Sequence, residues 1–78
     1  MRKKEMRLVA AFHTTDAAMA AERQCRSEGL SGKLITVPRS ITSDCGIAWS
    51  APITEAAATR TRLDSSGIEV AGYYELLL

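Results

Sequence analysis

The stretch that decides the fold is residues 8–37, which read LVAAFHTTDAAMAAERQCRSEGLSGKLITV. Its apolar run at residues 8–12 is rich in strand formers and too short for a helix, so it predicts one buried strand. A second strand is predicted over residues 33–37 and stops at Pro38, because proline cannot donate a hydrogen bond to a sheet. The segment between the two strands has the composition of a helix.

This helix is predicted over residues 16–28. A hydroxyl of Thr14 or Thr15 can cap its first N–H groups, and Asp16 suits the positive end of the helix dipole. Alanines and Cys25 recur at helical spacing, which predicts one apolar face along the helix. Gly29 then supplies the left-handed conformation that commonly ends a helix. Residues 8–37 therefore form a β-α-β unit.

The second half of the chain repeats this plan. A third strand is predicted over residues 45–50, a helix from Pro52 to Gly67, and a fourth strand over residues 68–76. Two β-α-β units of this size predict an α+β fold, a ferredoxin-like βαββαβ sandwich with a four-stranded antiparallel sheet and two helices on one face. We expect a single domain over residues 7–76, preceded by a basic tail at residues 1–6.

The predicted topology brings distant segments together. The first and third strands are central neighbours and run antiparallel, so the end of one lies beside the start of the other. Residues 13–16, the connection at 38–44 and Cys45 should therefore meet at one edge of the sheet. We expect a functional site there.

Composition and charge exclude several classes of function. A chain of 78 residues is too small for a multi-domain enzyme. Its net charge is +1 and three cations crowd into residues 2–4, so no basic face remains for a nucleic-acid partner. No apolar run approaches the ~20 residues of a membrane span, and the run at residues 8–12 is shorter than the core of a signal peptide. We expect a cytoplasmic protein with no membrane partner.

Cys45 is the main candidate for chemistry. It precedes Gly46, which leaves the thiol uncrowded, and follows a polar loop that carries Arg39. A nearby cation and the start of a helix would favour the reactive thiolate, whereas the neighbouring Asp44 works against it. The alternative is that Cys45 is a small apolar residue opening a strand.

The other candidates are weaker. Cys25 lies ~13 Å along its helix, beyond the ~7 Å that a disulfide to Cys45 allows, so we predict a core cysteine. His13 could activate Cys45 as a Cys–His pair, but a histidine at a strand end is more often a surface residue. Arg39 could bind an anion, or could be an exposed loop charge. Two cysteines without CxxC spacing and one histidine predict neither a metal site nor a cofactor.

Four segments carry a family resemblance. They are residues 12–18 (FHTTDAA), 37–41 (VPRSI), 43–48 (SDCGIA) and 72–76 (GYYEL). Together they resemble the bacterial selenium/sulfur carrier protein-like family. The resemblance implies that Cys45 is the motif cysteine, with Pro38, Arg39, Ser40 and Gly46 as its motif neighbours. Cys25 matches no motif position, and Asp44 stands where a smaller residue is more typical.

The resemblance leads to a carrier as the first functional hypothesis. Cys45 would hold sulfur or selenium as a persulfide or selenosulfide, between donor and acceptor enzymes such as a cysteine desulfurase. Arg39 and the helix start around Thr15 would stabilise the anion, Ser40 and Thr14 would hydrogen-bond it, and Gly46 would admit the partner. Such a protein is not an enzyme.

The second hypothesis is a non-catalytic binding or assembly module in which Cys45 is inert. Ferredoxin-like domains can pair through the sheet face that their helices leave bare. Here that face would carry small or mixed residues such as Val9, Gly46 and Ala48, and a homodimer would be the expected assembly. The fold alone does not choose between the two hypotheses.

Overall fold

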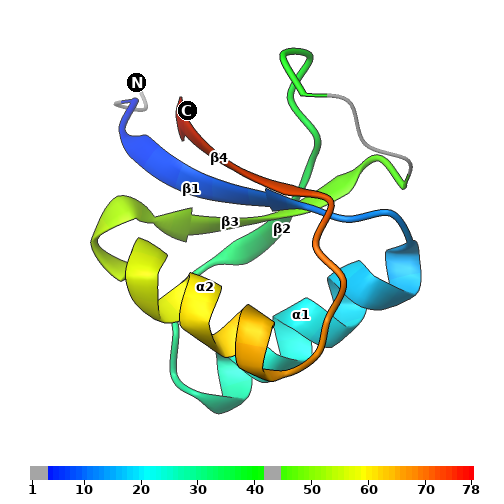
Figure 1. Cartoon of the computed structure of the whole chain (residues 1–78). Helices are drawn as coiled ribbons and strands as arrows, with labels where there is room; N and C mark the ends of the chain where they lie inside the picture. Colours follow the sequence, from blue (N-terminus) through cyan, green and yellow to red (C-terminus); the bar gives the residue numbers. More distant parts are fainter. Residues whose placement is uncertain (1–3, 42–44) are drawn as a thin grey trace.

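The computed structural model describes residues 4–41 and 45–78. Its elements follow the predicted order βαββαβ (Figure 1). They are β1 (Met6–Ala11), α1 (Thr15–Ser27), β2 (Lys33–Thr36), β3 (Ile47–Pro52), a 3-10 turn η1 (Ile53–Glu55), α2 (Ala56–Ser65) and β4 (Gly72–Leu77). The ferredoxin-like α+β fold is therefore confirmed.

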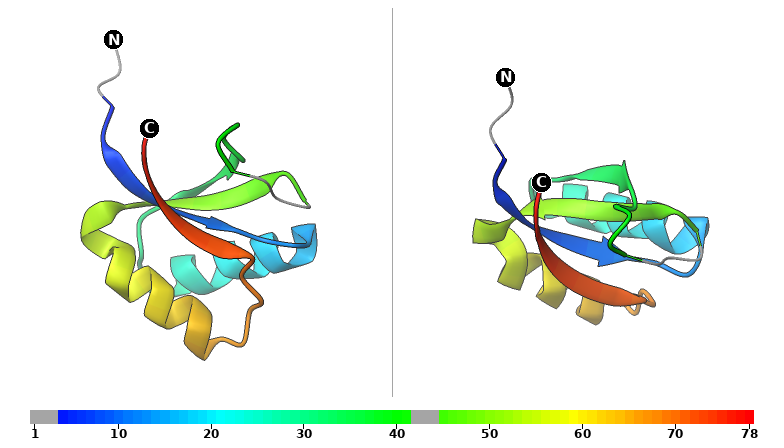
Figure 2. Two further views of the ribbon diagram at one scale, coloured as in Figure 1. Left: turned by 45° about the horizontal axis from the view of Figure 1, so that its top comes forward. Right: turned by 90° about the horizontal axis from the view of Figure 1, so that it is seen from above.

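The four strands form one antiparallel sheet in the order β2-β3-β1-β4. Both helices cover one face of this twisted sheet, and the other face is free of helices (Figure 2). Ala11, the last residue of β1, is paired with Ala48 on one side and with Gly72 on the other. The end of β1 thus lies beside the starts of β3 and β4, and we call this the site end of the sheet.

The main core lies between the sheet and the helices. Its largest fully buried side chains include Trp49 from β3, Phe12 after β1 and Leu63 from α2. Helix α1 contributes small residues, Ala18, Ala21 and Cys25, so it can pack close to the sheet. We call this cluster the helix-side core.

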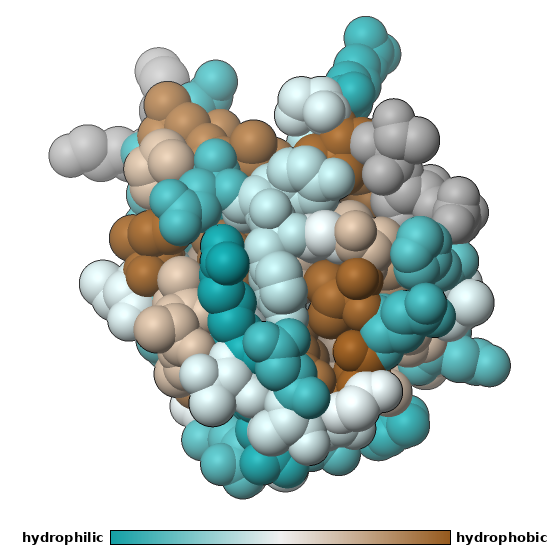
Figure 3. Space-filling view, viewed as in Figure 1, coloured by the Kyte–Doolittle hydropathy of each residue, from teal (hydrophilic) through white to brown (hydrophobic). Residues whose placement is uncertain are grey.

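A smaller apolar cluster lies on the face without helices, which we call the open face. Val9, Ala11, Ala48 and Ile41 form its buried part, and it is flanked by half-buried apolar residues of β2, β4 and their neighbours. The predictions for Val9 and Ala48 on this face are confirmed. Figure 3 also shows apolar side chains gathered near the start of β1 and the end of β4, where Met6 and Leu77 are exposed.

Several element boundaries differ from those predicted. Cys45 and Gly46 precede β3 instead of opening it, and Pro52 ends β3 instead of starting a helix. The fourth strand begins only at Gly72, because residues 68–71 form an extended link whose apolar side chains pack against the helix-side core. Alternate residues of this link are half-buried, as they are in a strand, which explains why the predicted strand begins at residue 68.

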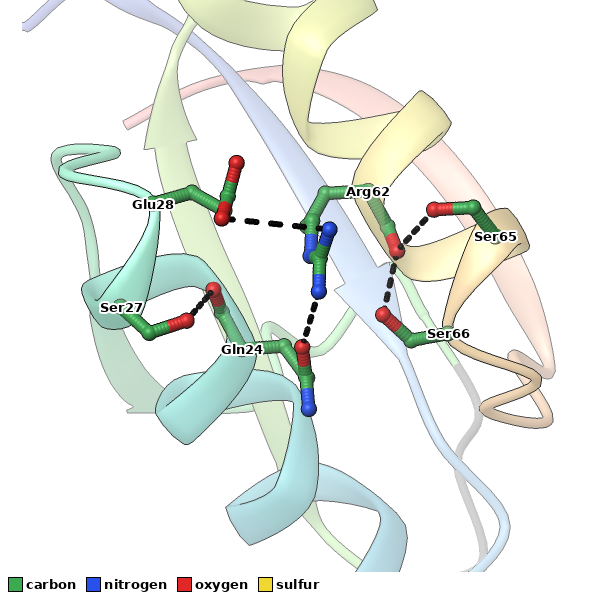
Figure 4. A network of polar contacts seen from close by, with 6 residues as sticks. All are labelled: Gln24, Ser27, Glu28, Arg62, Ser65 and Ser66. Atoms are coloured by element: carbon green, nitrogen blue, oxygen red, sulfur yellow. Dashed lines mark hydrogen bonds and ion pairs between the residues drawn. The ribbon is translucent and has the colours of Figure 1, made fainter.

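Arg62 ties the two helices together (Figure 4). Its guanidinium donates a 2.6 Å hydrogen bond to the Gln24 side chain of α1 and forms an ion pair with Glu28, 3.9 Å away. Next to this network, a shallow cleft of about 370 Å³ opens between the end of α1 and α2, with Leu30, Thr61 and Arg62 among its lining residues. The charge pattern of the sequence did not single out Arg62.

Candidate functional site

The site end of the sheet brings together the segments that the topology predicts. The backbone N–H of Val37 donates to the carbonyl of Gly46 at 3.0 Å, which closes the connection between β2 and β3. Cys45 therefore lies beside Phe12, at the point where the chain leaves β1 and enters α1. The predicted meeting of Cys45 with the end of the first strand is confirmed by this contact.

Cys45 is half-buried, with its sulfur directed at main-chain oxygens. The thiol lies 3.3 Å from the carbonyl oxygen of Phe12 and 3.3 Å from that of Ile47, and it can donate to both. A thiol has one proton, so these two bonds share one donor. The side chain also packs against the helix-side core. The sulfur is thus held between main-chain carbonyls on one side and the edge of the core on the other.

Gly46 allows the turn that places Cys45. Its φ of +75° lies in the left-handed region, which costs a residue with a Cβ about 1–2 kcal/mol. A Cβ built at this position has no heavy atom within 4 Å apart from its chain neighbours, so the space beside Gly46 is open. The glycine therefore serves the backbone conformation, and the space next to it is open.

The start of α1 is capped as predicted. Thr14 is the N-cap, and its hydroxyl oxygen accepts a 3.1 Å hydrogen bond from the N–H of Ala17. His13, Thr15 and Asp16 are all exposed around this helix start. Helix α1 begins at Thr15, four residues after the end of β1, so its positive dipole end lies at the site end of the sheet.

Arg39 and Ser40 lie elsewhere than predicted. Residues 38–41 form a turn in which the N–H of Ile41 donates to the carbonyl of Pro38 at 3.0 Å. Ile41 is only 7% exposed and packs on the open face, so the turn rises on the side opposite the helices (Figure 1). We expected residues 38–44 to meet the start of the first helix, but Ile41 anchors residues 38–41 to the face opposite the helices.

Other predicted residues are placed as follows. Arg39 and Ser40 are exposed at the tip of that turn, and Gly46 is exposed beside Cys45. Asp44 lies outside the described residues. Trp49 is fully buried and Tyr73 packs against the helix-side core, whereas Tyr74 is 37% exposed.

Cys25 is a core residue, as predicted. Its side chain is 0% exposed within the helix-side core, and no disulfide joins Cys25 to Cys45. Burial raises the pKa of the Cys25 thiol, and the nearby positive charge of Arg62 only partly opposes this. Cys25 is therefore a poor nucleophile in the folded protein.

Sequence reasoning did not identify the main-chain carbonyls of Phe12 and Ile47 as partners of Cys45. Every residue has a carbonyl, so no residue type could signal them. Within residues 4–41 and 45–78, no group of three or more His, Cys, Asp or Glu side chains is placed to hold a metal ion. In the same part of the chain, no helix has the length and apolar character to cross a membrane.

Comparison with known proteins yields one match. The family model described as "Putative Se/S carrier protein-like" matches residues 7–75, which is most of the chain. No curated protein and no solved structure matches. The matched range contains the site end of the sheet, including Cys45 and the turn that carries Arg39.

Proposed function

The chain belongs to the Se/S carrier protein-like family, and on this premise we propose that it carries sulfur or selenium on Cys45. The observation that carries this proposal is the difference between the two cysteines. The Cys45 side chain is half-buried and adjoins Gly46, next to which the space is open, whereas Cys25 is fully buried in the core. Cys45 is thus the thiol that a partner enzyme can reach.

The loading step is a thiol exchange. The Cys45 thiolate attacks the outer sulfur of a persulfide on a cysteine of the donor enzyme. An S–S bond forms to Cys45, the S–S bond of the donor breaks, and its electron pair leaves with the donor thiolate. The Cys45 proton passes to water, either directly or through the exposed His13. The transferred sulfur keeps its oxidation state, so no oxidant is needed, and selenium would form a selenosulfide by the same exchange.

The residues around Cys45 have distinct roles in this proposal. The start of α1, with Thr14 and Thr15, favours a negatively charged sulfur, because its free N–H groups and dipole are positive. His13 is exposed at the same place and can accept the thiol proton. The space beside Gly46 admits the active site of the partner.

Arg39 and Ser40 have a different role from the one their sequence position suggests. Their turn is anchored on the open face, so we assign them to contact with the partner enzyme and not to the sulfur. An exposed guanidinium suits a carboxylate of the partner. The donor and acceptor enzymes supply the catalysis, and the carrier itself has no turnover.

The experiment is persulfide transfer from a cysteine desulfurase supplied with L-cysteine. We expect intact-protein mass spectrometry to detect one added sulfur atom on the wild type and on Cys25→Ala, and none on Cys45→Ala. The added sulfur should be removed by a reducing thiol. Loading of Cys45→Ala to the wild-type extent would contradict the proposal, as would absence of loading on a folded wild type at high desulfurase concentration.

A second candidate function is assembly through the open face, with Cys45 inert. It is favoured by the apolar character of that face, where Ile35, Leu76 and Leu78 flank the buried cluster. Light scattering on the purified protein tests it. We expect Leu76→Glu to reduce the molar mass of a dimer to that of a monomer if this face assembles, and a monomeric wild type would eliminate this candidate.

A further inference from the structure

We propose that loading Cys45 breaks its hydrogen bonds to the carbonyls of Phe12 and Ile47 and turns the carried atom outward, so that empty and loaded carrier differ in local structure. The inference rests on the proposed function, since it describes the loaded state of that carrier. Its basis is the position of the Cys45 sulfur between the carbonyls of Phe12 and Ile47. Those carbonyls position the Cys45 sulfur in the empty carrier.

The empty state depends on the thiol proton. A carbonyl oxygen only accepts hydrogen bonds, so the two 3.3 Å contacts are favourable while the sulfur carries a proton. Loading replaces that proton by a sulfur or selenium atom. The Cys45 sulfur then has no proton to donate, and both carbonyls lose their thiol donor.

The outer atom also does not fit where the proton was. An S–S bond is ~2.05 Å long. An outer sulfur directed at either carbonyl would lie only ~1.3 Å from an oxygen that is 3.3 Å from the Cys45 sulfur. Non-bonded heavy atoms need ~3.5 Å or more. The directions toward these two carbonyls are therefore closed to the carried atom.

The remaining direction leads away from the carbonyls. The helix-side core packs against Cys45 from within the molecule, and core atoms leave little room for an added sulfur. Beside Gly46 the space is open. We assign the outer atom to this space, where a partner reaches it without moving the core.

This arrangement gives partners a way to distinguish the two states. In the empty protein the carbonyls of Phe12 and Ile47 are bonded to the thiol, and the space beside Gly46 is open. In the loaded protein that space holds the outer atom, and the two carbonyls no longer accept a hydrogen bond from the thiol. A donor enzyme can thus prefer the empty form and an acceptor the loaded form, with no larger change of fold.

The test uses methyl methanethiosulfonate labelled with ¹³C in the transferred methylthio group. The Cys45 thiolate attacks the thiosulfonate sulfur, an S–S bond forms to the methylthio group, and methanesulfinate leaves with the electron pair. We expect the carbonyl ¹³C resonances of Phe12 and Ile47 to move upfield, as carbonyls do when they lose a hydrogen-bond donor. We also expect nuclear Overhauser contacts from the added methyl group to the α protons of Gly46.

Two variants serve as controls. Cys45→Ala lacks the donor and should show the same upfield carbonyl shifts without the reagent. Cys25→Ala should behave like the wild type after modification, which assigns the effect to Cys45. Carbonyl resonances that do not move on modification would overturn the proposal, and so would contacts from the methyl group to buried side chains of the helix-side core.

Failure of this inference is separable from failure of the proposed function. The reagent needs no partner enzyme, so the carbonyl shifts can be measured even if a desulfurase does not load Cys45. Conversely, loading by the desulfurase with unchanged carbonyl resonances would leave the carrier function standing and refute only the outward turn.

Discussion

Replacing Cys25 by serine should destabilise the protein far more than replacing Cys45 by serine. Cys25 is 0% exposed and lies in the helix-side core, so serine would bury a hydroxyl among apolar side chains. A buried hydroxyl without a partner costs about 1–3 kcal/mol. Inside a helix it can bond to the carbonyl four residues earlier, here that of Ala21, which brings the expected cost to the lower part of this range, about 1–2 kcal/mol.

Cys45→Ser is the matched control. Cys45 is half-buried, and a serine hydroxyl can still donate toward the carbonyls of Phe12 or Ile47 or reach water. We expect a loss of no more than about 0.5 kcal/mol, as for substitutions outside a core. The two variants make the same chemical change at positions that differ in burial.

Thermal unfolding followed by circular dichroism at neutral pH measures the difference. For a domain of this size, 1 kcal/mol lowers the melting temperature by about 4–8 °C. Cys25→Ser should therefore melt about 5–15 °C below the wild type, and Cys45→Ser within about 4 °C of it. Equal losses for the two variants would refute the assignment of Cys25 to the core and of Cys45 to the site.

Three further predictions test the fold and the site. Gly32→Ala should lower the unfolding free energy by about 3 kcal/mol in urea titrations, because its Cβ would lie 2.6 Å from a buried tryptophan ring. Gly29→Ala is the control: its Cβ would have no atom within 4 Å, so it should lower the unfolding free energy by only about 1 kcal/mol. Equal losses for the two variants would argue against the close contact at Gly32. Burial and a hydrogen bond raise the pKa of Tyr73 to about 12, so the stability that this group contributes is complete below pH 10 and is lost as the pH rises toward 12. Tyr73→Phe should make stability less dependent on pH in that window, and an unchanged slope in urea titrations at several pH values would contradict this. Arg39→Ala should leave the rate of iodoacetamide labelling at Cys45 unchanged, because its turn rises on the open face; slower labelling would place the guanidinium near the sulfur after all.

Local patterns in the sequence were sufficient for the order of elements and for the fold class. The caps of α1 show why, since Thr14 at its start and Gly29 after its end act on backbone groups only a few residues away. The core position of Cys25 was likewise predictable, because a helix repeats every 3.6 residues and its apolar face is visible in the sequence. The predicted boundary of the fourth strand was less accurate, because residues 68–71 pack apolar side chains against the core without belonging to β4.

The sequence by itself determined that Cys45 lies at the junction of β1, α1 and β3, because the antiparallel pairing of β1 with β3 follows from the order of elements. Only the tertiary structure decided which face each neighbour occupies. Burial of Ile41 against the open face carries Arg39 away from the side on which Cys45 packs. The hydrogen bond from Cys45 to the carbonyl of Phe12 joins atoms 33 residues apart, and a main-chain oxygen has no signature in a sequence. Such contacts depend on how whole elements pack, so they become visible only when the chain is folded.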